Sequence, residues 1–268
     1  MIYDKISQRL TAIESHKLNA RHKAMLEDYY NALPSDDIFI VSALTGQAKR
    51  DWYHNGRDTL QKHFGDDAEL MADIIASLSP QQSVRLNLIM ALGIYTDWLA
   101  SGRALDNKTL AKLARKADLN CRKENLKRAL RRESLSGFKV RNFASNLKGD
   151  YTVATIDTWM MQFGDCKEAS GYQKLLHLAY NAKIRHIAGL MGWDTAQVQA
   201  GIWAFIYSKM SKVSVAEVPE FAELILNNAD IKESRLGALA VGSPSCRGIH
   251  YFHEETFGLE ANSQQKNT

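Results

Sequence analysis

The sequence has little of the chemistry that metal centres and disulfide scaffolds require. Its 268 residues include only three cysteines, Cys121, Cys166 and Cys246, and no two of them form a CxxC pair. This spacing excludes the usual ligand patterns of zinc sites and iron–sulfur clusters. A sparse, odd number of cysteines is also typical of a reducing compartment. We therefore expect no metal site, no iron–sulfur cluster and no disulfide framework.

The sequence also lacks long apolar runs. Residues 1–5 do not show the charged-then-apolar pattern of a signal peptide. The most apolar stretches, about 84–100 and 196–207, are amphipathic and too polar for a membrane span. We therefore expect a monomeric cytoplasmic protein that does not contact membranes.

Proline occurs only four times, and alternating β-branched runs are nearly absent. This composition predicts an all-α fold. The length suits one domain of two packed lobes, which we place at residues 1–258, followed by a disordered tail at 259–268. The expected helices span about 3–32, 37–46, 48–64, 69–78, 80–100, 106–117, 120–133, 139–147, 157–164, 172–191, 195–210 and 219–228.

Positive charge is concentrated in one region. Between Arg103 and Lys148 there are fourteen Lys and Arg residues against four acids, a balance of 14 − 4 = +10, whereas the whole chain carries +4 and its remainder therefore 4 − 10 = −6. Such segregation is typical of proteins that dock a polyanion, although a solvated helix face gives the same pattern. We expect double-stranded DNA to bind here.

A glycine turn between two basic helices lies within this region, at about 120–148. Backbone N–H groups at Ser136, Gly137 and Phe138 would face a DNA phosphate at the start of the second helix, and glycine lets the phosphate approach closely. Most turns of this kind are plain helix connections. Three outward-facing cations would add phosphate contacts: Arg131, Arg132 and Arg141.

Two residues eighteen positions apart have side chains suited to catalysis. Asp157 begins a predicted helix, where the ordinary role of an aspartate is to cap the backbone. The same carboxylate could stabilise an electron-poor sugar or activate a water molecule. Lys139 is either a solvated, phosphate-binding lysine or an amine nucleophile whose pKa is lowered by desolvation and nearby positive charge.

Two further features suggest contact with bases. Gln81 and Gln82 stand at the expected start of the helix at 80–100, where amides can enter a base stack and hydrogen-bond an unpaired base. Trp159 is close to Asp157 and is a candidate for stacking on a base. The other tryptophans, including Trp52 and Trp203, fall at helical spacing and are expected in the core.

In this order, the motifs resemble those of the helix-hairpin-helix superfamily of DNA glycosylases, which includes endonuclease III. The segment 78–83 (LSPQQS) is similar to the family's LSxQ(A/Q)T, and 135–140 (LSGFKV) is similar to its hairpin LPGVGxKxA. The segment 156–159 (IDTW) is similar to VD(T/V)H. The resemblance covers about residues 74–165. This hairpin is about two residues shorter than the family's, has one glycine where two are usual, and is followed by Trp159 in place of the family's histidine.

The resemblance implies a two-lobed, glycosylase-like fold and a DNA N-glycosylase that flips and excises a damaged or modified base. Asp157 would be the catalytic carboxylate, and Lys139 would be the Schiff-base nucleophile of an additional AP-lyase step. Gln81 would fill the gap left by the flipped base. A monovalent cation would bridge hairpin carbonyls, with no other cofactor.

Two alternatives stay open at this point. Residues 178–207 are similar to stretches of bacteriophage proteins, and the superfamily includes phage enzymes tied to hypermodified thymines. A transferase acting on modified thymine in DNA, in the host cytoplasm, is therefore one alternative. A non-catalytic DNA-binding module is the other.

Overall fold

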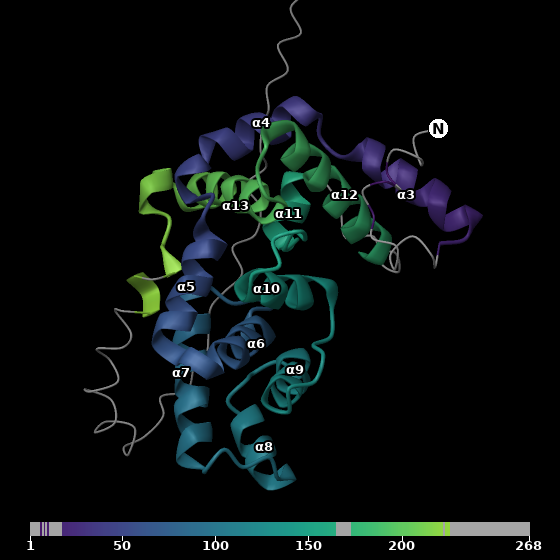
Figure 1. The fold of residues 1–268 in the computed structure, drawn as a ribbon. Helices are drawn as coiled ribbons and strands as arrows, with labels where there is room; N and C mark the ends of the chain where they lie inside the picture. Colours follow the sequence, from purple (N-terminus) through teal and green to yellow (C-terminus); the bar gives the residue numbers. More distant parts are fainter. Residues whose placement is uncertain are drawn as a thin grey trace, which may run out of the picture. The chain divides into compact units, whose positions relative to one another are not determined.

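The computed structural model describes residues 6, 8, 10, 18–164, 173–221 and 223–225. These belong to one compact unit, Met1–Asp230. All regular structure in these ranges is helical, with no strand among them, which confirms the predicted all-α class (Figure 1). The predicted tail at 259–268 and part of the predicted helix at 219–228 lie outside the described residues.

One set of helices packs around α6, and we call its buried interior the α6 core. Helix α6 (Ala68–Leu78) is apolar on nearly every side, and all its residues except Glu69 are buried. A helix of this kind must be surrounded, because no side of it gains from contact with water. Its neighbours are α5 (Trp52–Phe64), α7 (Val84–Ala100), α9 (Asn120–Leu130) and α10 (Phe138–Lys148), with α8 (Asn107–Ala114) against α7 and α9 (Figure 1).

A second set forms what we call the α12 core. It contains α3 (Ala20–Ala32), α4 (Asp36–Thr45), α11 (Thr158–Phe163), α12 (Gln173–Met191) and α13 (Thr195–Ser211). Helices α4 and α13 are in backbone contact, since a Cβ on Gly46 would overlap the carbonyl of Gly201. Short 3₁₀ turns lie at Gln47–Lys49, Gly65–Asp67 and Val215–Glu217.

Helix α13 belongs to both cores. Ala196 and Ala200 pack into the α6 core, whereas Val198, Ile202 and Ile206 pack into the α12 core. Because α13 also contacts α5, the two cores meet along this helix, and the candidate site lies at that junction.

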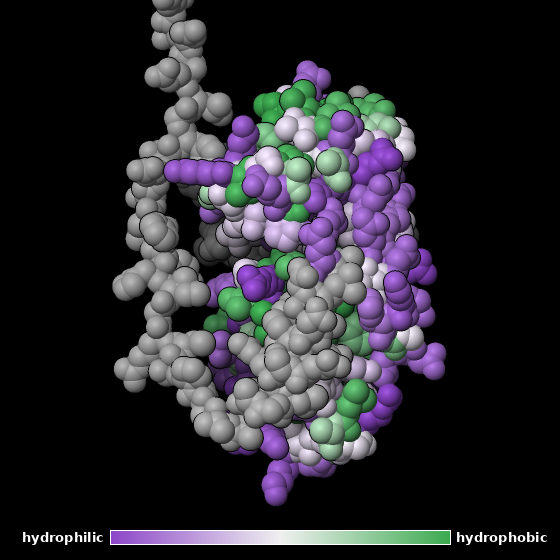
Figure 2. All heavy atoms as spheres, turned by 90° about the vertical axis from the view of Figure 1, so that its left-hand side faces the viewer, coloured by the Kyte–Doolittle hydropathy of each residue, from purple (hydrophilic) through white to green (hydrophobic). Residues whose placement is uncertain are grey.

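One side of the molecular surface carries both hydrophilic and hydrophobic areas. Figure 2 shows hydrophilic residues over much of the side that lies at the left in Figure 1, interrupted by smaller hydrophobic areas. Helix α4 contributes Ile38, Val41 and Leu44 to the exposed apolar surface, with Val41 62% exposed.

The predicted start of α7 is wrong. Helix α7 begins at Val84 with Ser83 as its N-cap, and not at Pro80. Gln81 has a positive φ of 53°, which is incompatible with the first turn of a helix and makes 79–83 a loop. Helix α13 begins at Thr195 as predicted, and its N-cap Asp194 forms a capping box with Gln197.

Candidate active site at the junction of the two cores

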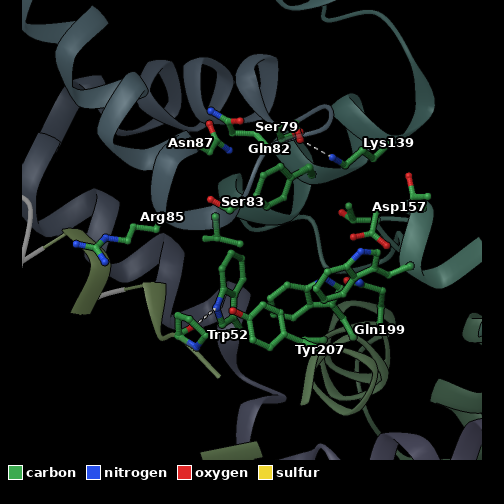
Figure 3. Close-up of a pocket in the computed structure, with 18 of the residues that line it drawn as sticks. Trp52, Ser79, Gln82, Ser83, Arg85, Asn87, Lys139, Asp157, Gln199 and Tyr207 are labelled. Atoms are coloured by element: carbon green, nitrogen blue, oxygen red, sulfur yellow. Dashed lines mark hydrogen bonds between the residues drawn. The ribbon is translucent and has the colours of Figure 1, made fainter. Parts of the chain in front are cut away.

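A cavity of about 560 Å³ lies where the two cores meet (Figure 3). Its walls come from α5, the 79–83 loop, the first turn of α7, α10, the segment 155–159 and α13. Pro219 adds to its edge. This volume falls within the range of small-molecule and cofactor sites. Sequence segments more than a hundred residues apart therefore share one concave surface.

Aromatic rings form much of the cavity wall. Trp159 stacks on Trp203 with ring centroids 6.2 Å apart and planes 16° apart, and Tyr207 packs 5.3 Å from each of them. Trp52 continues the wall, with its ring 6.1 Å from Trp203 and 6.3 Å from Phe143. Flat aromatic faces of this kind favour a planar ligand.

The 79–83 loop is held by two cations through its carbonyl groups. Lys139 Nζ donates to the Ser79 carbonyl at 2.9 Å, and Arg122 Nε donates to the Pro80 carbonyl at 2.7 Å. Arg122 is only 3% exposed, although it belongs to the basic region in which the sequence suggests solvated cations. A buried guanidinium requires acceptors, and the loop carbonyl is one. The loop in turn places Gln81 and Gln82 in the cavity lining.

Asp157 lies in the cavity wall and also caps α11. Its Oδ1 accepts a hydrogen bond from the Met160 N–H at 2.9 Å, so the capping role is confirmed. Desolvation by burial raises the pKa of this carboxyl group, against opposing effects from the Met160 hydrogen bond, the Lys139 charge and Trp203. The cap fixes the carboxyl group and does not remove it from the cavity.

Lys139 lines the same cavity from the first turn of α10. Desolvation by burial lowers the pKa of its amine, and the Arg122 charge lowers it further, whereas the Asp157 carboxylate raises it. The two side chains interact electrostatically, yet no direct ion pair joins these two described residues. The arrangement therefore places an amine that loses its proton unusually easily near a carboxyl group that gains one unusually easily.

The hairpin turn has the predicted glycine at the predicted place. Gly137 has a φ of 89°, a conformation that favours glycine, and it is the N-cap of α10. The Ser136 N–H donates to Asn125 Oδ1 at 2.7 Å, so this group is not free for a phosphate, contrary to expectation. The Gly137 and Phe138 N–H groups form no hydrogen bond within the described ranges. They lie at the start of α10, where the first turn of a helix leaves its N–H donors without a helical partner.

The hairpin carbonyls already have partners. Asn125 Nδ2 donates to the Ser136 carbonyl at 3.0 Å, and Arg128 Nη1 donates to the Ser134 carbonyl at 3.2 Å. The guanidinium adds a fixed positive charge beside the turn, so the carbonyls of Ser134 and Ser136 do not fit a bound cation.

The remaining predicted DNA contacts lie outside the cavity lining. Arg131 Nη2 donates to Asn107 Oδ1 at 3.2 Å, and Arg132 pairs with Asp67 at 3.1 Å. The Arg141 guanidinium lies 4.9 Å from the centre of the Phe138 ring. All three arginines are exposed. The structure therefore groups Lys139, Asp157, Trp159, Gln81 and Gln82 in one site and leaves the other cations on the surface.

The sequence analysis missed several cavity residues. Trp52 is in the core as expected and Trp203 is partly buried against the α12 core, but both also line the cavity, and Asn87 and Gln199 were not identified. One signal was present: Gln199, Trp203 and Tyr207 follow each other at four-residue steps and so share one side of α13. A helix side that mixes amide and aromatic groups is typical of a binding wall and not of a plain core.

The described ranges contain neither a candidate metal site nor a helix that could span a membrane. No group of three or more His, Cys, Asp or Glu side chains there is placed to hold a metal ion. Within the same ranges, every helix is too short or too polar to cross a bilayer.

Comparisons of this chain with curated proteins and with solved structures find no match. A family model does match residues 40–210, more than half of the chain, and the protein therefore belongs to that family, a family of unknown function (DUF7178).

Proposed function

We propose that the protein is a DNA N-glycosylase with an associated AP-lyase step, built on a two-lobed fold like that of the helix-hairpin-helix glycosylases. One observation carries the proposal: Lys139 and Asp157, on separate elements, line a single aromatic-walled cavity. An aromatic wall suits a base taken out of the duplex, and the two polar groups suit reaction at the attached sugar.

Asp157 acts on the developing charge of the sugar. As the bond between C1′ and the base nitrogen breaks, its electron pair leaves with the base and the sugar becomes oxocarbenium-like. A carboxylate fixed by its hydrogen bond to Met160 stabilises that positive charge without reorganising. The departing base takes up a proton as it leaves.

Lys139 acts as the nucleophile. Because desolvation lowers the pKa of its amine, a larger fraction is neutral near physiological pH than for a solvated lysine. The nitrogen forms a bond to C1′, loses its proton, and gives an iminium once the sugar ring opens. Loss of a C2′ proton then expels the 3′ phosphate by β-elimination.

The outer surface supports binding of the duplex. The N–H groups of Gly137 and Phe138 at the start of α10, together with exposed Arg141, suit one backbone phosphate. The net charge of +10 between Arg103 and Lys148 provides the wider attraction. In this proposal a monomer binds the duplex in the cytoplasm, which is the host cytoplasm for a phage-encoded protein. Gln81, in its left-handed loop, fills the gap in the duplex.

The test measures free base released from duplex oligonucleotides that each carry one oxidised, alkylated or 5-substituted base, detected by mass spectrometry. We expect release from at least one substrate. Asp157→Asn should reduce the rate by about 10²- to 10⁴-fold while leaving DNA affinity unchanged. Asp73→Asn is the matched control, because Asp73 pairs with another lysine of α10 and is absent from the cavity lining.

Two results would contradict the proposal. Salt-sensitive DNA binding without release from any duplex would indicate a non-catalytic binding module. Reaction that occurs only with an added amine or amino acid, and that leaves the base attached to DNA, would indicate a transferase acting on modified thymine.

A further inference from the structure

Three of the four carboxamide side chains in the cavity wall, those other than Gln81, differ in how they are held. Gln82 Nε2 lies 2.9 Å from Met90 Sδ, and Gln199 Oε1 accepts a hydrogen bond from the Tyr53 hydroxyl at 2.7 Å. Asn87 also lines the cavity, from the first turn of α7, but its Oδ1 has no hydrogen-bond partner among the described residues (Figure 3). Contacts within the protein therefore orient two of these amides, whereas the oxygen of the third, Asn87, has no partner among the described residues.

The unpaired amide oxygen of Asn87 is unusual because the residue is buried. The residue is only 3% exposed, so bulk water does not compensate for the missing hydrogen bond. Ser79, 5% exposed and also in the cavity lining, has a hydroxyl oxygen in the same condition. Buried polar atoms in native structures nearly always have partners, so each exception calls for an explanation. A ligand in the cavity supplies one.

The amide of Asn87 is free to turn toward such a ligand. No hydrogen bond among the described residues holds its oxygen, so rotation about its terminal torsion breaks no bond to that atom, and that torsion is broad and soft. After rotation one amide presents an N–H donor and a carbonyl acceptor side by side. The natural complement is a ligand edge that carries one donor next to one acceptor.

We propose that Asn87 recognises the donor–acceptor edge of a flat heterocycle held between the aromatic walls of this cavity. The ligand class is a heterocycle with an N–H group beside a carbonyl oxygen or a ring nitrogen, as unblocked nucleobases have. This inference deepens the proposed function, since it takes the occupant of the cavity to be a base. It assigns Asn87 to specificity and not to bond cleavage.

The test uses free bases, so that it depends neither on DNA binding nor on catalysis. Quenching of the intrinsic fluorescence of Trp52, Trp159 and Trp203 reports occupancy of the cavity. The probes are 1-methylthymine with 1,3-dimethylthymine, and 9-methyladenine with N6,N6,9-trimethyladenine, in which a methyl group stands where the sugar would be. In each pair the second member is blocked, because its further methyl groups remove the remaining N–H donor. The wild-type protein should bind at least one unblocked base about tenfold more tightly than its blocked partner.

Asn87→Leu keeps the side-chain size and removes both hydrogen-bonding groups. It should abolish the difference in affinity within that pair. Binding of the unblocked base should weaken about tenfold, while binding of the blocked base should stay unchanged. Thr96→Val is the matched control on the same helix, because Thr96 is outside the cavity lining and bonds only the Leu92 carbonyl. It should leave both affinities unchanged, and circular dichroism should show all variants equally folded.

Three results would overturn the inference: no quenching by any probe, equal binding of blocked and unblocked bases by the wild type, or discrimination that survives Asn87→Leu. Failure of the proposed glycosylase function would give a different set of results from failure of this inference. If base release from DNA is never observed but Asn87-dependent discrimination is, the cavity is a base-binding site without glycosylase activity.

Discussion

Helix α10 carries two lysines near two different aspartates, and the two pairs are built differently. Near the end of the helix, Lys148 forms a direct ion pair with Asp73 of α6, with Nζ and Oδ1 2.6 Å apart. At the start of the helix, Lys139 donates to the Ser79 carbonyl, while Asp157 accepts from the Met160 N–H. The second pair lines the cavity and interacts electrostatically, without a direct ion pair.

The comparison separates a structural pair from a reactive one. Burial raises the pKa of both Asp73 and Asp157, so desolvation alone does not distinguish them. The difference is that Lys148 and Asp73 satisfy each other, whereas Lys139 and Asp157 are each fixed by backbone groups. Fixed in this way, both side chains keep atoms available to a ligand between them, which a closed ion pair does not allow.

The largest expected difference between the two pairs is in how much stability the fold loses when each aspartate is replaced. Asp73→Asn removes the charge opposite Lys148 and should lower the free energy of unfolding by about 1–3 kcal/mol. Asp157→Asn should cost far less, because asparagine is as good an N-cap as aspartate. Urea denaturation at pH 7 measures both values. Equal losses in the two variants would show that Asp157 is a structural ion-pair partner like Asp73.

A smaller contrast concerns the pH dependence of stability. The pKa of Asp157 is raised in the folded protein, so between the ordinary carboxyl pKa of about 3.9 and the raised value the folded state binds more protons than the unfolded state. This group's contribution to the free energy of unfolding should therefore fall as pH rises through that window, and stay low above it. Asp157→Asn should lack this decrease.

The measurement is a series of urea denaturations of wild type and Asp157→Asn across the acid range. The wild type should lose stability relative to the variant as pH rises. The opposite slope would mean that the carboxylate is stabilised in the folded state, as in an ordinary surface ion pair, and would remove the basis for its proposed role.

The sequence was sufficient for features that depend on near neighbours. Asp157 is an N-cap as predicted, because capping involves residues two or three positions away. Gly137 begins the helix that carries Lys139, also as predicted. The short loop between α10 and α11 brings Lys139 and Asp157 to one cavity, as the resemblance to the helix-hairpin-helix glycosylases implied.

Features that depend on distant partners were not foreseeable. Arg122 matches an exposed basic helix by composition, and only the packing of α9 against α6 places it at the Pro80 carbonyl. The free Ser136 N–H was predicted without knowledge of Asn125, which binds it. Asn87 is one polar residue among many in the sequence, and its lack of a partner exists only after folding.

The most direct test of the central claim, that Lys139 reaches a sugar in this cavity, is borohydride trapping on a duplex with a single abasic site. This probe needs no knowledge of the excised base. The wild type should form a covalent protein–DNA adduct, Lys148→Met should form it equally, and Lys139→Met should not. An adduct that persists in Lys139→Met, or that never forms with the wild type under conditions where the abasic duplex is bound, would contradict the role of Lys139.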